Sequence, residues 1–263
     1  TLSSSSAASD VYKRQDFYSV NRTCMLKTNK PYSVISSYYD KMMDHVDYVM
    51  WANYLKSILK YFGIKGRRIA DLSCGTGSLL DNLKIRKSKL VGGDLSINML
   101  KSARIKPGIP LVCADLKASC FKKESFDVVF VLYDSMNYML SDEDTARVFS
   151  EISYTLKPQG WFIFDIVTPY ICEKDFHDYH ESDFENDKGY ERRSWFISNG
   201  NKQFNEFIIW DGDKKQVELH EQHIRSLNEW QRLIDESPFE LINLFGDFSF
   251  RKGHDKSDRI HYI

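Results

Sequence analysis

The stretch Ile69-Ala70-Asp71-Leu72-Ser73-Cys74-Gly75-Thr76-Gly77-Ser78-Leu79-Leu80 decides the fold of this chain. It predicts a short buried strand that ends at Asp71, then a turn of small residues, then the start of a helix. Gly75 and Gly77 allow the backbone to turn tightly and allow a ligand to approach the main chain closely. The N–H groups at the start of a helix bind such a ligand readily. We therefore predict a nucleotide-type binding loop at the carboxyl edge of a parallel sheet.

Two features of this loop argue against a dinucleotide ligand. A dinucleotide fingerprint has the form G-x-G-x-x-G, and Leu80 occupies the position of its third glycine. Asp71 precedes the glycines, where its carboxylate would repel a pyrophosphate but would tolerate an amine or a sulfonium. A glycine-rich turn that only joins a strand to a helix is the alternative interpretation, so other parts of the chain have to decide between the two.

The same residues closely resemble motif I of class I S-adenosylmethionine (SAM)-dependent methyltransferases, which is usually written D-x-x-C-G-T-G. Ser73 stands where that family often has alanine or glycine. The resemblance implies SAM as the cofactor and S-adenosylhomocysteine as its product. It also implies that the loop contacts the cofactor through Asp71, Ser73, Cys74, Gly75 and Gly77.

An acidic residue also ends the next predicted strand, Lys89–Asp94. Asp94 lies 17 residues after Gly77, where it is well placed to accept both ribose hydroxyls of a nucleoside, as in dinucleotide folds. Ser96 is then a good N-cap for the following helix. This region resembles the G-x-D-x-S-x-x-M-L phrase of the methyltransferase family, which implies that Leu95 and Met99 also lie at the cofactor.

A third strand, predicted over Pro110–Asp115, again ends in an acid. In the family that the chain resembles, the acid that matches Asp115 binds the adenine amino group, and the residue that matches Leu116 flanks the ring. One such carboxylate alone is more often a turn or cap residue. Three of them at three successive strand ends favour a nucleoside site.

The continuously apolar run Phe126–Leu132 predicts a central parallel strand that is buried on both faces. In this fold Leu132 lies at the cofactor, and the residues just past the strand face the reacting methyl group. Asp134 and Tyr138 are therefore candidates for a catalytic base or an orienting group toward an acceptor amine or hydroxyl. In related amino-sugar N-methyltransferases a histidine stands where this chain has Tyr138. The segment Leu156–Ile166, LKPQGWFIFDI, predicts a stop-and-turn and a fifth strand, and it resembles the family's L-x-P-G-G-x-x-x-x-D.

The segment Ile35–Phe62 shows apolar residues at the helical spacings of three and four, and Asp44 or Asp47 is expected to cap a second helix within it. The segment resembles the N-terminal lid of small-molecule methyltransferases, and we assign the lid helices to residues 33–62. The resemblance implies that Tyr39 reaches both the cofactor and the substrate, so Tyr39 is a cofactor-binding and a catalytic candidate. A helix pair that only covers one sheet face is the simpler interpretation for most of these residues.

Three short β-rich segments with hairpin turn signals between them follow an irregular stretch from Thr168 to Asp187; they are Tyr190–Ser198, Gln203–Trp210 and Gln216–Arg225. They predict a three-stranded antiparallel insert over the carboxyl edge of the sheet. Its histidines could suggest a metal, but strand alternation places His220 and His223 on opposite faces. We expect these two, with His177 and His180, to be surface residues, and we predict no metal.

The last part of the chain predicts one helix and two strands. Ser226 and Glu229 form a capping box for a helix through Asp235, and the segments Phe239–Phe245 and Asp258–Ile263 predict the last strands, antiparallel to each other in the family's topology.

The predicted fold is α/β, a Rossmann-like doubly wound sheet of seven strands whose last strand is antiparallel, with a small antiparallel β insert. Residues 16–169 and 226–263 make up the SAM-binding domain, and residues 170–225 form the insert or lid.

Residues 1–15 predict a non-native or disordered leader. Residues 2–9 are of low complexity and cannot build a core. The segment Asp10–Gln15 back-translates to a sequence that resembles a transposon-end sequencing adapter. We therefore leave these residues out of the fold prediction.

Composition narrows the class of partner. The 263 residues include 28% charged residues with a net charge of −1, which gives no electrostatic case for nucleic-acid binding. No apolar run approaches the length of a membrane span. The five cysteines are odd in number and form no C-x-x-C pair, which favours a reducing cytosol over a disulfide framework. We expect a cytoplasmic monomer or homodimer.

Two classes of function remain open at this point. The first is a SAM-dependent methyltransferase that moves a methyl group to a nitrogen or oxygen of a small-molecule acceptor. The second is a methyltransferase-like module that binds a nucleoside or a partner without catalysis. Motif I, together with Asp94 and Asp115, favours cofactor binding in either class. Only the acceptor pocket would distinguish these two classes of function.

Overall fold

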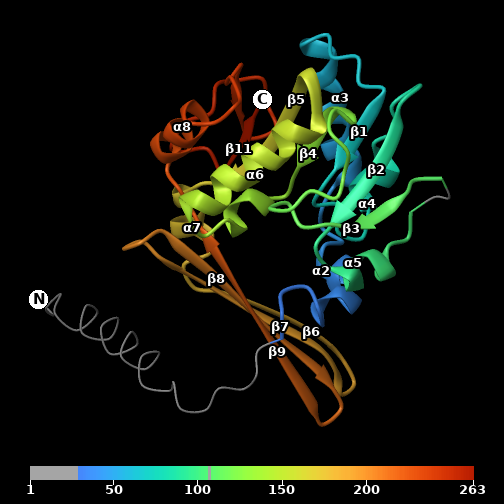
Figure 1. Cartoon of the computed structure of the whole chain (residues 1–263). Coiled ribbons are helices and arrows are strands. Elements are labelled where there is room, and N and C mark those ends of the chain that lie inside the picture. The colour runs from blue at the N-terminus through green and yellow to red at the C-terminus, as the bar shows by residue number, and fades with distance from the viewer. Residues whose placement is uncertain (1–28, 106–107) are drawn as a thin grey trace, which may run out of the picture.

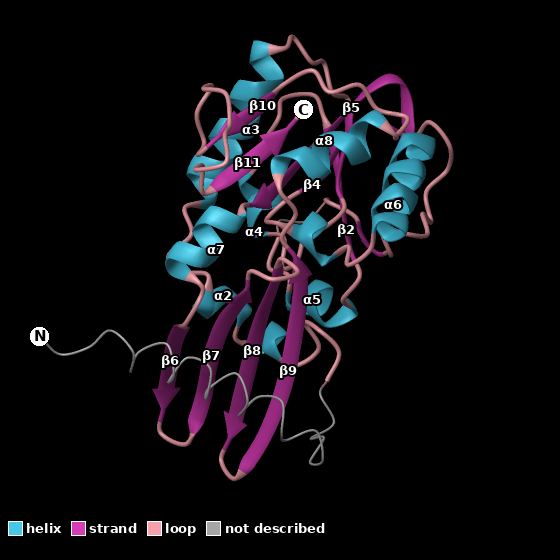
Figure 2. Ribbon diagram, turned by 90° about the vertical axis from the view of Figure 1, so that its left-hand side faces the viewer, coloured by secondary structure: helices cyan, strands magenta, loops and turns pink. Residues whose placement is uncertain are grey.

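The protein is described by a computed structural model that covers residues 29–105 and 108–263. The expected leader at residues 1–15 lies outside the described residues. The chain forms a seven-stranded mixed sheet with helices on both faces, and a separate four-stranded antiparallel sheet beside it (Figures 1 and 2). The predicted doubly wound α/β fold with a β insert is confirmed.

The helical elements, in chain order, are η1 (Ile35–Ser37), α2 (Tyr39–Met42), α3 (Tyr48–Tyr61), α4 (Ser78–Asn82), α5 (Ile97–Ser102), η2 (Ser135–Tyr138), α6 (Asp142–Thr155), α7 (Pro169–Asp175) and α8 (Leu227–Asp235). The strands of the large sheet are β1 (Arg68–Asp71), β2 (Lys89–Asp94), β3 (Leu111–Cys113), β4 (Phe126–Val131), β5 (Leu156–Val167), β10 (Leu244–Gly246) and β11 (Arg259–Tyr262). The strands of the small sheet are β6 (Tyr179–Glu185), β7 (Lys188–Ile197), β8 (Lys202–Asp211) and β9 (Lys214–His223).

The large sheet has the strand order β10-β11-β5-β4-β1-β2-β3. Strands β1 to β5 are parallel, and β11 pairs antiparallel with both β5 and β10, as the sequence predicts for the last two strands. The chain builds outward in one direction from β1 and in the other from β4. The neighbouring carboxyl ends of β1 and β4 are therefore a topological switch point, where α/β sheets bind their ligands.

Strand β4 shows how the core is divided between the two faces of the sheet. Val128 and Phe130 belong to the apolar cluster formed with α3 and α4. Val129 and Val131 belong to the cluster on the other face, with α6 and α8. All four side chains are fully buried, as the unbroken apolar sequence of this strand predicts.

Helix caps place the elements where the sequence predicts them. Asp47 is the N-cap of α3 and accepts a hydrogen bond from the N–H of Met50, which splits the long N-terminal helical segment. Ser96 caps α5 in the same way. Ser226 and Glu229 form the predicted capping box at the start of α8.

The insert differs from its prediction in one respect: it has four strands, because β6 lies within the stretch expected to be irregular. Residues of β6 pair with β7 along their whole length. Helix α7, which also lies in that stretch, is capped by Thr168. Strand β6 is an edge strand of mostly polar residues, and its burial pattern alternates only weakly. An apolar period is therefore too weak a signal to reveal it.

Two further boundaries shift. Residues 157–160 bulge out of β5 as the sequence's turn signal predicts, because Phe126 pairs with Leu156 while Val128 already pairs with Trp161. The strand expected over Phe239–Phe245 is confined to the three residues of β10.

Candidate functional site

The loop between β1 and α4 needs glycine at two positions. Gly75 and Gly77 have positive φ angles of 56° and 82°, a conformation that residues with a side chain adopt at a cost. A Cβ atom at Gly75 would lie 3.2 Å from the Cε of Met99. A Cβ atom at Gly77 would overlap the side chain of Ile105. The conformation of the loop therefore depends on its two glycines and on the close packing of Met99 and Ile105 against them.

The carboxylate of Asp94, at the end of β2, holds this loop. It accepts hydrogen bonds from the N–H of Gly75 and from the N–H of Ser96, both at 2.8 Å. Burial raises the pKa of Asp94, and the two N–H donors oppose that rise. The two bonds fix the carboxylate beside the glycine loop.

The ends of β1 and β4 are joined through Ser73. Its hydroxyl accepts a hydrogen bond from the N–H of Leu132 at 2.8 Å and donates one to the carbonyl of Leu132 at 3.1 Å. Asp71 is buried and accepts a hydrogen bond from the N–H of Ser73. Burial raises the pKa of Asp71 to about 7. Ser73, where the resembled family often has a smaller residue, is therefore part of the scaffold of the switch point.

A cavity of about 40 Å³ lies at the switch point. The site residues predicted from sequence that line it are Tyr39, Asp71, Ser73, Cys74, Gly75 and Leu132. The ring of Tyr133, an aromatic candidate just past β4, lines it as well, together with those of Tyr48 and Trp51, to which no role was assigned from sequence. This volume is well below the roughly 300–1,000 Å³ of a small-molecule pocket.

The lid is tied directly to the glycine loop. The hydroxyl of Thr76 donates a hydrogen bond to the carboxylate of Asp40 at 2.6 Å. The ring of the adjacent Tyr39 lies next to Gly75, 4.0 Å from the position of a Cβ atom there. The structure thus brings Tyr39 to the motif I loop, as the resemblance implies.

Six predicted cofactor residues do not line this cavity: Gly77, Asp94, Leu95, Met99, Asp115 and Leu116. Leu95 is 69% exposed. Asp115 and Leu116 line a second hollow of about 10 Å³ next to Leu72. Asp115 accepts a hydrogen bond from the N–H of Lys117, so in this conformation its carboxylate closes a turn.

The loop after β4 contains two strained residues held by an acid that sequence analysis did not single out. Tyr133 and Asp134 have positive φ angles of 60° and 51°, which costs about 1–3 kcal/mol each. The buried carboxylate of Asp165 accepts hydrogen bonds from both of their N–H groups, at 2.6 and 3.0 Å. Arg259 forms an ion pair with Asp165. Asp165 lies one residue before the end of the predicted fifth strand, so an acid near a strand end was the signal that could have identified it.

Arg259 serves two carboxylates at once. Besides Asp165, it binds one carboxylate oxygen of Asp134 at 3.1 Å, and Gln222 of β9 donates to the other at 2.7 Å. Burial raises the pKa of Asp134 and that of Asp165, and the guanidinium of Arg259 opposes both rises. Both oxygens of Asp134 are thus engaged, which suits an orienting group better than a free base.

Tyr138 belongs to a partly buried hydrogen-bonded chain that sequence analysis missed. Its hydroxyl lies 2.8 Å from the hydroxyl of Tyr32 and 2.9 Å from Nδ1 of His220. Nε2 of His220 lies 3.1 Å from a carboxylate oxygen of Glu218. His220 and Glu218 are both fully buried, so the expectation that His220 is a surface residue is wrong. Strand alternation shows which residues share a face, but not which face is covered.

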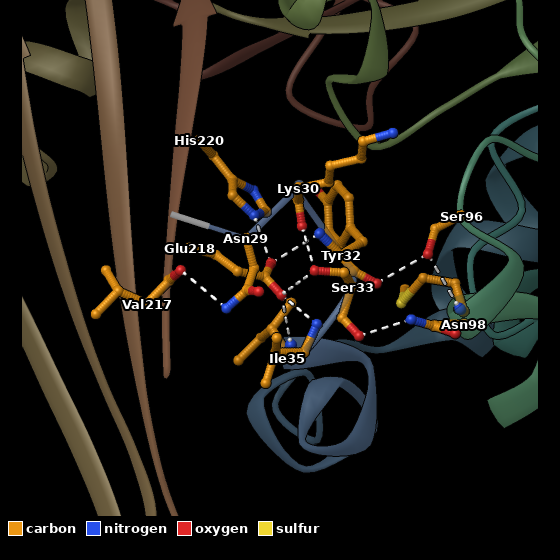
Figure 3. Close-up of polar contacts among 12 residues, drawn as sticks. Asn29, Lys30, Tyr32, Ser33, Ile35, Ser96, Asn98, Val217, Glu218 and His220 are labelled. Carbon is orange, nitrogen blue, oxygen red and sulfur yellow. Dashed lines mark hydrogen bonds and ion pairs between the residues drawn. The ribbon is translucent and has the colours of Figure 1, made fainter. Parts of the chain in front are cut away.

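Glu218 also binds residues 32–35, which lead into the lid helices and are called the lid segment here (Figure 3). Its carboxylate accepts hydrogen bonds from the N–H groups of Tyr32, at 2.7 Å, of Val34, and of Ile35, at 3.0 Å. From the other side, the hydroxyl of Ser96 donates to the carbonyl of Tyr32 at 2.8 Å. The lid segment is therefore bound between β9 of the insert and the start of α5.

Within the described ranges, no group of three or more His, Cys, Asp or Glu side chains is arranged to hold a metal ion. No helix in those ranges is long and apolar enough to cross a membrane.

Sequence comparison finds one matching protein family and several similar proteins. Residues 69–160 match the protein family described as "Methyltransferase domain". The chain is 27% identical over 242 residues to a protein provisionally assigned as a methyltransferase in Geobacillus sp. (strain WCH70), a match that covers 88% of this chain and 98% of that protein. It is 35% identical over 118 residues to the malonyl-[acyl-carrier protein] O-methyltransferase of Legionella pneumophila, covering 42% and 40% of the two chains.

Solved structures show the same architecture. The crystal structure of a SAM-dependent methyltransferase from Clostridium acetobutylicum superposes with a TM-score of 0.71 at 24% identity, over 86% of this chain and 94% of that one. A sugar N-methyltransferase from Streptoalloteichus sp. superposes with a TM-score of 0.69 at 18% identity, over 86% and 92% of the two chains. Residues 69–160 of this chain therefore form a methyltransferase domain, and the chain has the α/β fold of the class I methyltransferases.

Proposed function

We propose that the protein transfers a methyl group from SAM to a nitrogen or oxygen atom of a small-molecule acceptor. The observation that carries this proposal is the hydrogen bond by which Asp94, at the end of β2, holds Gly75 of the motif I loop at the switch point of the sheet. The carboxylate of Asp71, the glycine loop and aromatic residues of the lid line one cavity at the same switch point.

The residues present fit SAM in their chemistry. The glycines leave the main chain of the loop open to close approach, since a side chain at Gly75 or Gly77 would meet Met99 or Ile105. Asp94 would accept the ribose hydroxyls. Asp71 and the rings around the cavity would favour a positive charge. Because the cavity is small, Tyr39 and the lid segment would move outward to admit the cofactor.

When bound, SAM supplies a methyl group activated by its sulfonium. The chain's own residues then hold the acceptor in line with that group, and such positioning can supply much of the acceleration. Tyr39 would line the methyl site from the lid. Asp134, fixed by Arg259 and Gln222, would orient the acceptor, and Tyr138 in η2 would support that side of the site through its hydrogen bond with Tyr32.

A small acceptor is supported by the way in which the site is enclosed. The lid covers the glycine loop, and β9 of the insert contacts the loop after β4 through Gln222 and Asp134. Enclosure excludes water and strengthens electrostatic interactions within the site. The solved sugar N-methyltransferase of similar fold supports the same class of acceptor. We place the protein in the cytoplasm on its cysteine usage, since the four described cysteines are free thiols.

The test is calorimetric titration with SAM, S-adenosylhomocysteine and NAD, followed by a screen of metabolites with methyl-labelled SAM. We expect binding of the first two ligands and labelling of at least one metabolite. Binding without any labelling would support the alternative of a nucleoside-binding module. Labelling of bulk tRNA or protein in preference to every metabolite would contradict a small acceptor.

A further inference from the structure

Four side chains from three distant segments form one continuous hydrogen-bonded chain. It runs from Glu218 through His220 and Tyr138 to Tyr32, with successive distances of 3.1, 2.9 and 2.8 Å. Glu218 and His220 come from β9 of the insert, Tyr138 from η2 after β4, and Tyr32 from the lid segment. Figure 3 shows the part of this chain at Glu218, His220 and Tyr32.

Glu218 fixes the direction of every hydrogen bond in the chain. Its carboxylate can only accept, so Nε2 of His220 carries the proton and donates it. Nδ1 of the neutral ring is then an acceptor, and the hydroxyl of Tyr138 donates to it. The oxygen of Tyr138 is left to accept from the hydroxyl of Tyr32. The oxygen of Tyr32 remains at the end of the chain as an acceptor.

The ring of His220 is held in its basic form. Burial lowers the pKa of His220, and Arg192 of β7 adds to that effect, while Glu218 opposes it. For Glu218, burial would raise the pKa, but the hydrogen bonds from His220 and from the N–H groups of Val34 and Ile35 hold it below its ordinary value. A neutral imidazole backed by an ionised carboxylate is the arrangement of a general base.

The open end of the chain lies next to a residue that lines the cavity at the switch point. The ring of Tyr32 packs edge-on against that of Tyr39 at 6.0 Å, and Tyr39 lines the cavity with Gly75. The carbonyl of Tyr32 accepts from Ser96, two residues beyond Asp94. Tyr32 itself has a positive φ of 59°, a strained conformation of the kind found at functional sites.

We propose that this chain is a proton relay that deprotonates the acceptor, so that the substrate class is a molecule whose reacting nitrogen or oxygen carries a removable proton. Such acceptors are alcohols, phenols and protonated amines. This inference rests on the proposed function. Tyr32 is the catalytic residue that touches the acceptor, while Tyr138, His220 and Glu218 are positioning residues that act through it.

The proton balance of the step is simple. As the acceptor atom bonds to the methyl carbon, its proton passes to the oxygen of Tyr32, the proton of Tyr32 passes to Tyr138, and that of Tyr138 passes to Nδ1 of His220. The imidazolium that forms is stabilised by Glu218. It returns its proton to solvent along the same route once the product has left.

The experiment compares Tyr138→Phe and His220→Gln with the wild type, using the metabolite that the labelled-methyl screen identifies. General-base catalysis contributes about 100- to 10,000-fold. We expect each variant to lose about 100-fold or more in kcat, with a nearly unchanged KM and unchanged affinity for S-adenosylhomocysteine. The double variant should be no slower than the slower single variant, because residues that act as one unit are not additive. His223→Gln, on the same strand but outside the relay, is the matched control and should retain turnover.

Two readouts separate a relay from a merely structural role. The wild-type rate should fall on the acid side as His220 becomes protonated, and this limb should be absent in His220→Gln. Nitrogen-15 NMR of the imidazole in the complex with S-adenosylhomocysteine should show a neutral ring with the proton on Nε2. A proton on Nδ1, a charged ring at neutral pH, or full turnover in Tyr138→Phe would overturn the relay while leaving the methyltransferase proposal intact. Failure to label any metabolite would overturn both.

Discussion

Asp165 and Arg259 form an ion pair between the adjacent antiparallel strands β5 and β11, directly at the strained loop that follows β4. Asp165 is completely buried, and 15% of the Arg259 side chain is exposed. The same guanidinium binds Asp134. One cation therefore compensates two buried carboxylates, and the turn that faces the proposed methyl site depends on it.

Replacing Arg259 by methionine should destabilise the protein strongly. Removing one partner of a buried ion pair leaves uncompensated charge and costs about 3–5 kcal/mol. Chemical denaturation at neutral pH measures the loss. Arg251→Met, at an exposed position five residues after the end of β10, serves as the control and should change stability little. A loss below about 1 kcal/mol for Arg259→Met would contradict the central role of this pair.

The loss in Arg259→Met should also depend on pH. Burial raises the pKa of Asp134 and that of Asp165 above the unfolded value of about 3.9, and without the guanidinium nothing comparable opposes that rise. A carboxyl whose folded pKa is raised stabilises the fold below the unfolded pKa and loses that contribution as pH rises. The variant should therefore be closest to the wild type in acid and furthest from it in mild alkali.

Asp71 gives a second, independent pH dependence. Burial raises its pKa to about 7, so its ionisation works against folding as pH rises from about 4 to about 7. Asp71→Asn removes this effect. The stability of that variant relative to the wild type should rise over this range by up to about 4 kcal/mol, since each pKa unit corresponds to about 1.4 kcal/mol. Urea denaturation at several pH values tests it, and a difference that does not change with pH would argue against a buried, protonatable Asp71.

Asp94 should control cofactor affinity. Asp94→Ala should weaken the binding of SAM by about 1.5–3 kcal/mol, the range for a hydrogen bond to a charged group. Calorimetry measures the change. Because Asp94 also holds the N–H of Gly75, Asp94→Asn is the companion variant: it keeps a hydrogen-bond acceptor for the loop while removing the charge. Unchanged affinity in a folded Asp94→Ala protein would remove Asp94 from the cofactor site.

The predicted catalytic residues should affect turnover more than binding. Asp134→Asn and Tyr39→Phe should each retain SAM affinity better than Asp94→Ala does, while lowering kcat with the metabolite identified in the screen. The reason is that both side chains are assigned to the acceptor side of the methyl site. Parallel calorimetry and turnover assays give the comparison. If a variant lost SAM binding without losing kcat, its side chain would belong to the cofactor side of the site and not to the acceptor side.

Glu218 should govern the opening of the lid segment. Glu218→Gln removes a charged acceptor from the N–H groups of Tyr32, Val34 and Ile35, and such a bond contributes about 1.5–3 kcal/mol. Hydrogen exchange at these amides should become at least about tenfold faster. Glu221→Gln, which removes only an exposed ion pair with Lys202, is the control and should leave them unchanged.

The fold was predictable where local chemistry decides it. The strand–loop–helix at motif I, the caps at Asp47 and Ser96, and the buried central strand β4 all follow from residues close in sequence. The edge strand β6 was missed because its partner β7, rather than any apolar period of its own, holds it in place.

The site was predictable only in part, for a related reason. Motif residues around Gly75 are close together in sequence and were identified. The relay joins residues 32, 138 and 220, and the ion pair joins residues 165 and 259, so both depend on how distant strands meet. Nothing in a single segment distinguishes a buried histidine such as His220 from an exposed one such as His180, since both lie in polar strands.

The anchoring of the lid segment by Glu218 has a consequence for protein engineering. Strand β9, which contacts the proposed acceptor side through Gln222, also binds the lid segment through Glu218. Other strands of the insert hold the lid as well, because Lys41 pairs with Asp183 of β6 and Met42 packs in one apolar cluster with Tyr190 of β7. A chimaera that carries the insert of another methyltransferase, chosen to change acceptor selectivity, would therefore also lose the Glu218 contacts that hold the lid segment in place. Selectivity and closure have to be transplanted as a matched pair, with the N-terminal segment taken from the same donor as β9.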